Sequence, residues 1–177
     1  MRDLLEAERR HLGNLLEAIQ RCVYFLDQSA SKLQWPLTAT VLAENKKDVA
    51  LFESLAAINE RFAKLQDTLA AAMRHSALLM GEPAEHFLKV LALFEKIGVL
   101  DSVDSWQRCR ATRNMAAHDY ETDYGDIAEH FNTLRELAVP MYQASRRLID
   151  RCRLDLGVEP SSRDFAAEFD LVTRQNA

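Results

Sequence analysis

Apolar residues recur at steps of three and four through most of this chain, and this spacing is the strongest constraint on its fold. Residues three and four apart share one face of an α-helix, whereas a half-buried strand alternates at every second residue. No segment shows the strand pattern, so the chain is predicted to be all-α. Three series carry the spacing: Leu12, Leu16, Ile19, Val23 and Leu26; Phe52, Leu55, Ile58, Phe62, Leu65, Leu69 and Met73; and Ile127, Phe131, Leu134, Ala138, Met141, Ser145, Leu148 and Cys152.

Turn and cap residues divide the periodic stretches. Trp35-Pro36 ends the first helix, because proline cannot continue the hydrogen-bond ladder and restricts the residue before it. Gly81 and Gly98 suit helix ends, while Ser102 and Asp123 suit helix starts. The first predicted helix covers 3–32, and the second begins between 42 and 48 and ends near 80. The third covers 83–97, the fourth runs from 103 to 117 or 118, and the fifth runs from 123 to 157. A short terminal helix follows, capped by Ser161 or Ser162.

Three segments carry further expectations. Residues 37–47 are polar and poorly periodic, so we predict a connection with at most a short turn. The helix over 83–97 is apolar on much of its circumference and is predicted to be the most buried of the set. The helix that begins at 103 has few apolar residues and buries little by itself, which indicates a place at a pocket or a subunit interface.

Length and composition fit a single domain. A chain of 177 residues is long enough for one domain with its own hydrophobic core, and two domains are not expected at this length. Nearly half of the residues are hydrophobic, and glycine and proline are few (5 and 4), which is typical of a helical globular protein. We expect an up-and-down bundle of about five helices over residues 1–157. Residues 158–177 form a tail whose short C-terminal helix either covers the bundle or docks on a partner.

Charge and cysteine usage limit the partners and the compartment. A net charge of −5 argues against a broadly basic surface that coats nucleic acid. The three cysteines are far apart and lack C-x-x-C spacing, so they read as reduced thiols rather than as a disulfide framework or a zinc site. Three of the first six residues are charged (Arg2, Asp3 and Glu6), and no run of 18 apolar residues occurs. These features predict a cytoplasmic protein that does not span a membrane.

The motifs of several enzyme classes are missing. The sequence has no glycine-rich phosphate loop, no Gly-x-Ser-x-Gly and no histidine or cysteine pair at metal-binding spacing. His118 and His130 are too isolated in sequence to count as metal ligands. We therefore expect no metal and no cofactor.

A polar cluster stands at the end of the predicted fourth helix. Arg113, Asn114, His118 and Tyr120 lie within eight residues. On a helix, Asn114 and His118 share a face, and the long side chain of Arg113 can reach the same patch. Arg113 and His118 themselves point about 140° apart on an ideal helix. A site that uses both needs either a helix end near His118 or a second copy of the helix across a dimer interface.

An imidazole and a guanidinium permit metal-free RNA cleavage by the neighbouring 2′-hydroxyl. Histidine titrates near neutral pH and moves the protons, while arginine stabilises the extra charge on the phosphate oxygens. Arg108 and Arg110 stand just before the cluster, and no acid lies between Ser105 and His118, so a local basic patch could receive a phosphate.

The cluster resembles the R-x4-H-x-Y signature of the HEPN superfamily, in the form found in HepT-like toxins, which often carry a polar residue just after the arginine. We extend the resemblance over about residues 1–155, because family members are all-α bundles with the motif late in the domain. It implies a metal-independent endoribonuclease that acts as a homodimer. Arg113, His118 and Asn114 would then be the catalytic residues, with RNA as substrate and Arg108 and Arg110 as further substrate-binding residues.

The same resemblance implies a partner. In HepT-like toxins the motif tyrosine, here Tyr120, is the residue that a cognate MNT-type nucleotidyltransferase antitoxin modifies with AMP. A phosphoryl adduct beside Arg113 would add negative charge and bulk where the RNA phosphate binds. The modification would therefore block the site.

Two other functions compete with this one. Related HEPN proteins help a nucleotidyltransferase to bind its substrate, carry similar motifs and cleave nothing themselves. The chain could also be a helical interaction protein in which Arg113 and His118 only make interface hydrogen bonds. Acids crowd the motif at Asp119, Glu121, Asp123 and Asp126, and they would repel RNA unless they point away.

Overall fold

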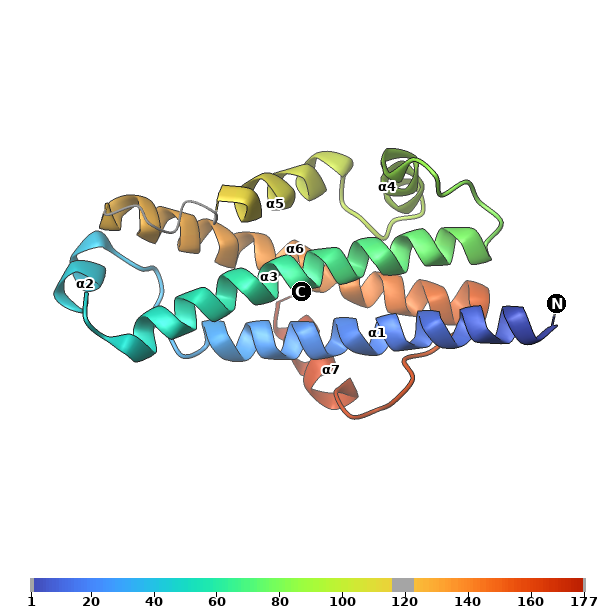
Figure 1. Ribbon diagram of the computed structural model, residues 1–177, viewed down its shortest axis with the longest axis horizontal. Helices are drawn as coiled ribbons and strands as arrows, with labels where there is room; N and C mark the ends of the chain where they lie inside the picture. Colours follow the sequence, from blue (N-terminus) through green and yellow to red (C-terminus); the bar gives the residue numbers. More distant parts are fainter. Residues whose placement is uncertain (1, 116–122, 177) are drawn as a thin grey trace.

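The computed structural model describes residues 2–115 and 123–176, and the described part of the chain is all-helical. Three long helices lie side by side, and four shorter ones pack around them (Figure 1). In chain order the helices are α1 (Arg2–Ala30), α2 (Ala39–Glu44), α3 (Val49–Leu79), α4 (Phe87–Lys96), α5 (Val103–Met115), α6 (Tyr124–Leu156) and α7 (Ala166–Gln175). The predicted helical bundle is thus confirmed.

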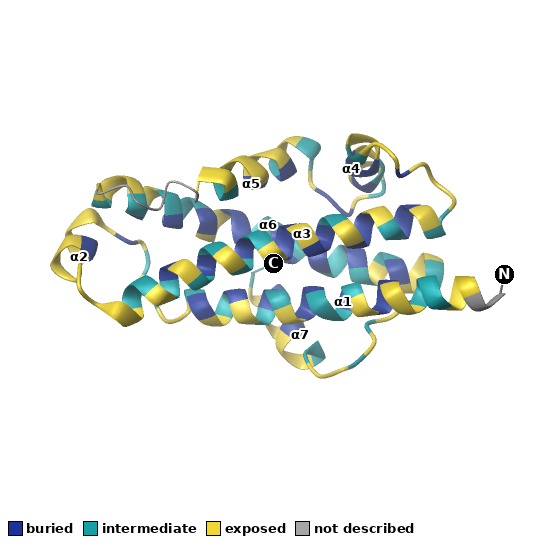
Figure 2. Cartoon of the chain, viewed as in Figure 1, coloured by how far each residue is buried: buried dark blue, intermediate teal, exposed yellow. Residues whose placement is uncertain are grey.

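The core lies between α1, α3 and α6. The residues of the three periodic series point inward, and Leu16, Phe62 and Leu148 are completely buried. Figure 2 shows the resulting stripes, with buried positions facing the centre of the bundle and exposed ones facing outward. Truncating a buried phenylalanine such as Phe62 to alanine costs about 3–5 kcal/mol in a typical core.

Local cap signals fix the ends of the long helices. Asp48 precedes α3 and accepts a hydrogen bond from the Leu51 N–H at 3.1 Å. The Asp123 carboxylate accepts bonds from two backbone N–H groups at the start of α6, as its sequence position predicted. Gly157 ends α6 with φ of 60°, a left-handed conformation that glycine adopts without a steric cost.

Residues 37–47 contain a helix where the sequence predicted a connection. Thr38 caps α2 by accepting a hydrogen bond from the Val41 N–H, and Leu42 is completely buried. One buried leucine in six residues gives too short a pattern to show periodicity. This short helix packs on α6, and Asn132 of α6 holds the preceding chain by two hydrogen bonds to the backbone of Leu37.

The helix predicted over 83–97 is shorter and more exposed than expected. It begins at Phe87, and Leu88 on its outer face is 62% exposed. Only Val90, Leu91 and Phe94 are buried, because this short helix contacts α3 and α5 with one face. The prediction that this helix is the most buried of the set, which was based on its apolar composition, was therefore wrong. The expectation that Pro83 would open the helix was wrong as well.

The helix that carries Arg113 packs lightly on the bundle. Ser102 accepts a hydrogen bond from the Ser105 N–H, as its predicted cap role requires, and Glu95 of α4 accepts one from the Val103 N–H. Trp106 and Cys109 are the buried residues of α5. No other described residue of α5 is buried, in keeping with the prediction that this helix buries little.

The tail covers the bundle. Helix α7 lies across α1 and α6, on the opposite side from α4 and α5 (Figure 1). Phe169 and Val172 of α7 are buried, and Arg146 of α6 forms an ion pair with Asp170 of α7 at 3.0 Å. The predicted serine cap was wrong, since Phe165 occupies the cap position and makes no side-chain cap bond.

Replacing Gly13 with alanine should loosen the tail. A Cβ at this buried position of α1 would meet the Ser161 Oγ at 2.8 Å and the Glu159 carbonyl oxygen at 3.0 Å. Overpacking of this kind costs about 1–3 kcal/mol, against which the better helix propensity of alanine recovers less than about 1 kcal/mol. Denaturant unfolding should show a lower midpoint for Gly13→Ala. An unchanged or raised midpoint would mean that the tail does not need this close approach.

Candidate functional site

The two described motif residues lie in the last turn of α5. Arg113 and Asn114 are the eleventh and twelfth residues of that helix, which ends at Met115. His118 and Tyr120 lie outside the described residues. The predicted meeting of Arg113, Asn114 and His118 over one patch stays a prediction.

Arg113 is held against α3. Its Nη1 donates a hydrogen bond to Asp67 Oδ1 at 2.5 Å and another to the Ala63 carbonyl oxygen at 3.3 Å. The arginine is 24% exposed and the aspartate 62% exposed. An ion pair this open to water contributes less than about 1 kcal/mol, so an incoming anion could displace the carboxylate at small cost. Sequence reasoning missed Asp67, which stands 46 residues away.

The other predicted substrate-binding residues lie on the outer side of α5. Arg108, Arg110 and Asn114 are exposed, and Met115 is 62% exposed. None of these three polar side chains forms a hydrogen bond or an ion pair within residues 2–115 and 123–176. This face of α5 is therefore open to a ligand or to another protein.

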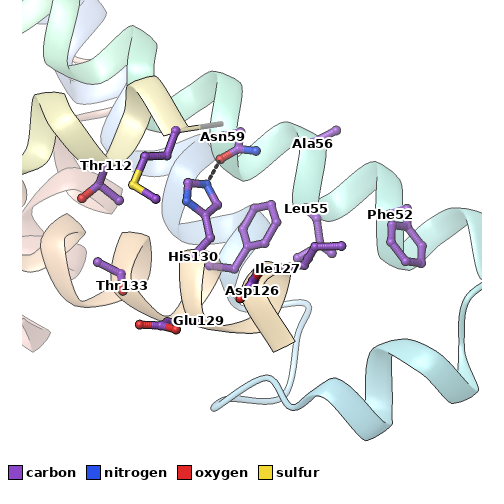
Figure 3. Close-up of a pocket in the computed structure, with 12 residues that line it drawn as sticks. Phe52, Leu55, Ala56, Asn59, Thr112, Asp126, Ile127, Glu129, His130 and Thr133 are labelled. Atoms are coloured by element: carbon purple, nitrogen blue, oxygen red, sulfur yellow. Dashed lines mark hydrogen bonds between the residues drawn. The ribbon is translucent and has the colours of Figure 1, made fainter. Parts of the chain in front are cut away.

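A pocket of about 610 Å³ lies directly beside the end of α5. Its walls come from α3, α5 and α6, and Thr112 and Met115 contribute the α5 side (Figure 3). A volume of this size falls in the range of small-molecule and cofactor sites, about 300–1,000 Å³. The described lining residues are Phe52, Leu55, Ala56, Asn59, Thr112, Met115, Asp126, Ile127, Glu129, His130, Phe131 and Thr133.

An imidazole reaches this pocket from α6. His130 Nε2 donates to the Asn59 Oδ1 of α3 at 2.9 Å, and Figure 3 shows the two side chains turned toward each other. Because an amide oxygen only accepts, this bond places a proton on Nε2. The ring also packs edge-on against Phe131, with the centroids 5.1 Å apart. His130 was set aside in sequence as isolated, since its partner lies 71 residues away.

Acidic side chains share this end of the bundle. Asp126 and Glu129 line the pocket, Asp123 caps α6 beside it, and Asp67 pairs with Arg113. The positive end of the α6 dipole offsets part of the charge of Asp123 and Asp126. The local field at this end of the bundle is therefore mixed rather than basic.

The cysteines play no part in this chemistry. All three are free thiols, and Cys109 and Cys152 are buried. Burial raises the pKa of both thiols to about 11, so neither is a thiolate near neutral pH. In the described part of the chain, no three histidine, cysteine or acidic side chains come together in a way that could hold a metal ion.

Comparison with known proteins finds no relative: no family model matches the chain, and neither a curated protein nor a solved structure matches it significantly. The resemblance to the HEPN superfamily thus depends on the sequence motif. None of the described helices combines the length and the apolar character that crossing a membrane requires.

Proposed function

We propose that this protein is a HepT-like endoribonuclease of the HEPN type that cleaves RNA without a metal ion. The observation that carries the proposal is the position of Arg113, at the exposed end of a lightly packed helix and beside a pocket of ligand size. In the sequence, Asn114 follows Arg113 directly, and His118 and Tyr120 come five and seven residues after it.

The chemistry follows from the residue types. The 2′-hydroxyl attacks the adjacent phosphorus, the bond to the 5′-oxygen breaks, and the products are a 2′,3′-cyclic phosphate and a 5′-hydroxyl. His118 would take the proton of the attacking hydroxyl, and the second copy of His118 in a dimer would protonate the leaving oxygen. Arg113 would bind the phosphate oxygens, where charge develops in the transition state. Asn114 would orient the imidazole or the phosphate.

The proposal includes a homodimer formed through the outer side of α5. Arg108, Arg110, Asn114 and Met115 are exposed there among residues 2–115 and 123–176, and they would meet the second copy of α5. Two motifs facing each other would provide the base, the acid and a cleft for RNA.

The second candidate is a non-catalytic HEPN partner that helps a nucleotidyltransferase to bind substrate. The ion pair between Arg113 and Asp67 and the acids of the neighbouring pocket favour it, because both reduce the attraction for RNA. In that case the pocket, rather than the arginine, would be the part that binds.

Expression in a bacterial host separates these functions. The wild-type chain should arrest growth and degrade RNA, while Arg113→Ala and His118→Ala should each lower cleavage at least about 100-fold, because each removes a group that acts in the transition state. Growth curves and RNA integrity in the same cells provide the measurement.

Matched controls are available elsewhere in the chain. Arg153 is an exposed arginine near the far end of α6, and His86 is an exposed histidine without a side-chain cap bond. Arg153→Ala and His86→Ala should remain as toxic as the wild type. Soluble protein that leaves growth and RNA intact in every form would contradict the ribonuclease and favour the binding partner.

Releasing Arg113 from Asp67 should speed the reaction. Asp67→Asn removes the competing carboxylate, and the weakness of exposed ion pairs sets the gain at about two- to fivefold. The rate of RNA cleavage by purified protein at low salt is the measurement, with Asp150→Asn as the control, since Asp150 also pairs with arginines. A slower reaction in Asp67→Asn would instead mean that the carboxylate holds Arg113 in its working position.

Tyr120 is the proposed site of neutralisation. Co-expression with an MNT-type nucleotidyltransferase encoded beside this chain should add AMP to Tyr120 and restore growth, because the adduct places negative charge next to Arg113. Peptide mass analysis should find the adduct on Tyr120 and should find none in Tyr120→Phe. Neutralisation that leaves Tyr120 unmodified would exclude this mechanism.

A further inference from the structure

A second pocket, of about 500 Å³, lies on a different part of the bundle. It is bounded by the C-terminal end of α1, the connection that follows it and the middle of α6, and none of its described lining residues belongs to the first pocket. Leu26, Ile58 and Val139 give it apolar walls. The inference drawn from it is independent of the proposed ribonuclease activity.

Several polar groups of this pocket are already engaged in holding its walls. The Trp35 Nε1 donates to the Ala30 carbonyl oxygen at 2.8 Å. Asn132 both accepts from and donates to the backbone of Leu37, at 2.8 and 2.9 Å. These hydrogen bonds hold the connection after α1 against α1 and α6. The wall of the pocket that this connection forms is therefore fixed in place.

Tyr142 and Asp27 are two of the polar side chains of this pocket. Tyr142 is 4% exposed, and within residues 2–115 and 123–176 nothing hydrogen-bonds its hydroxyl. The half-buried carboxylate of Asp27 likewise has no hydrogen bond and no ion pair in that part of the chain. A carboxylate and a hydroxyl that no group of the described residues engages are available to hydrogen-bond a ligand in the pocket.

The charges of the pocket favour a cation. Asp27 and Glu136 are its acids, and Arg135 is its one described base. The Arg135 guanidinium lies over the Trp35 ring, 4.9 Å from the centroid, and forms no ion pair with Asp27. Burial raises the pKa of the Asp27 carboxyl, and Arg135 opposes that rise only in part. A second positive charge near Asp27 would stabilise the ionised carboxylate.

We propose that this pocket binds a small primary alkylamine, with its ammonium group between Asp27 and Tyr142. An ammonium group has three donors, which suit a carboxylate and a phenol oxygen together. The alkyl chain would lie along Leu26, Ile58 and Val139. An anion such as phosphate is excluded, because it would face the Asp27 carboxylate in a partly desolvated site.

The two tryptophans of the chain make a direct test possible. Trp35 lines the pocket, whereas Trp106 lies on α5, away from it. In a ¹H–¹⁵N spectrum of the full chain, titration with n-pentylamine should shift the indole signal of Trp35 in a saturable way and leave that of Trp106 in place. 1-Pentanol, which has the same chain without the charge, should bind at least roughly tenfold more weakly.

Variants identify the contacts. Asp27→Asn should weaken n-pentylamine binding roughly tenfold or more, and Tyr142→Phe should weaken it by a smaller factor. Glu6→Gln removes an exposed charge from the same helix and should change nothing. The Trp106 signal and the circular dichroism spectrum report whether each variant is folded. Equal binding of pentanol, no saturable shift in the wild type, or full binding by a folded Asp27→Asn would each overturn the proposal.

Discussion

The packing of α3 against α1 and α6 determines the position of everything else in this protein. Phe62 and its neighbours on α3 are buried on the core side, while the outer side of the same helix supplies Ala63 and Asp67 to hold Arg113. α3 also provides Asn59, the partner of His130 from α6. One helix therefore joins the hydrophobic core to the candidate site, and a shift of α3 would move both polar contacts together.

The candidate site combines strong scaffolding with weak polar contacts. The core that positions α3 and α6 is worth many kilocalories per mole, whereas the ion pair of Arg113 is exposed and contributes less than about 1 kcal/mol. Such an arrangement keeps the arginine oriented in the absence of substrate and allows it to change partners when an anion arrives.

Much of the fold could be predicted from the sequence, because its signals are local. Periodicity indicated the long helices, and Asp123 and Gly157 capped α6 where their chemistry suggested. The errors came from tertiary context: α2 has one buried leucine, and α4 is apolar without being deeply buried. The site was predicted only as a motif. Asp67 and Asn59 escaped notice because each is more than 40 residues from its partner and has no spacing signal of its own.

The most direct test of the central claim is the chemistry of the cut. Purified protein should cleave cellular RNA in excess EDTA, and mapping of the ends should find 2′,3′-cyclic phosphates and 5′-hydroxyls. Replacing the 2′-hydroxyl at a mapped site with hydrogen should abolish the cut there, because the attacking group is gone. Cleavage that requires a divalent metal ion, or that proceeds without the 2′-hydroxyl, would contradict a mechanism based on Arg113 and His118.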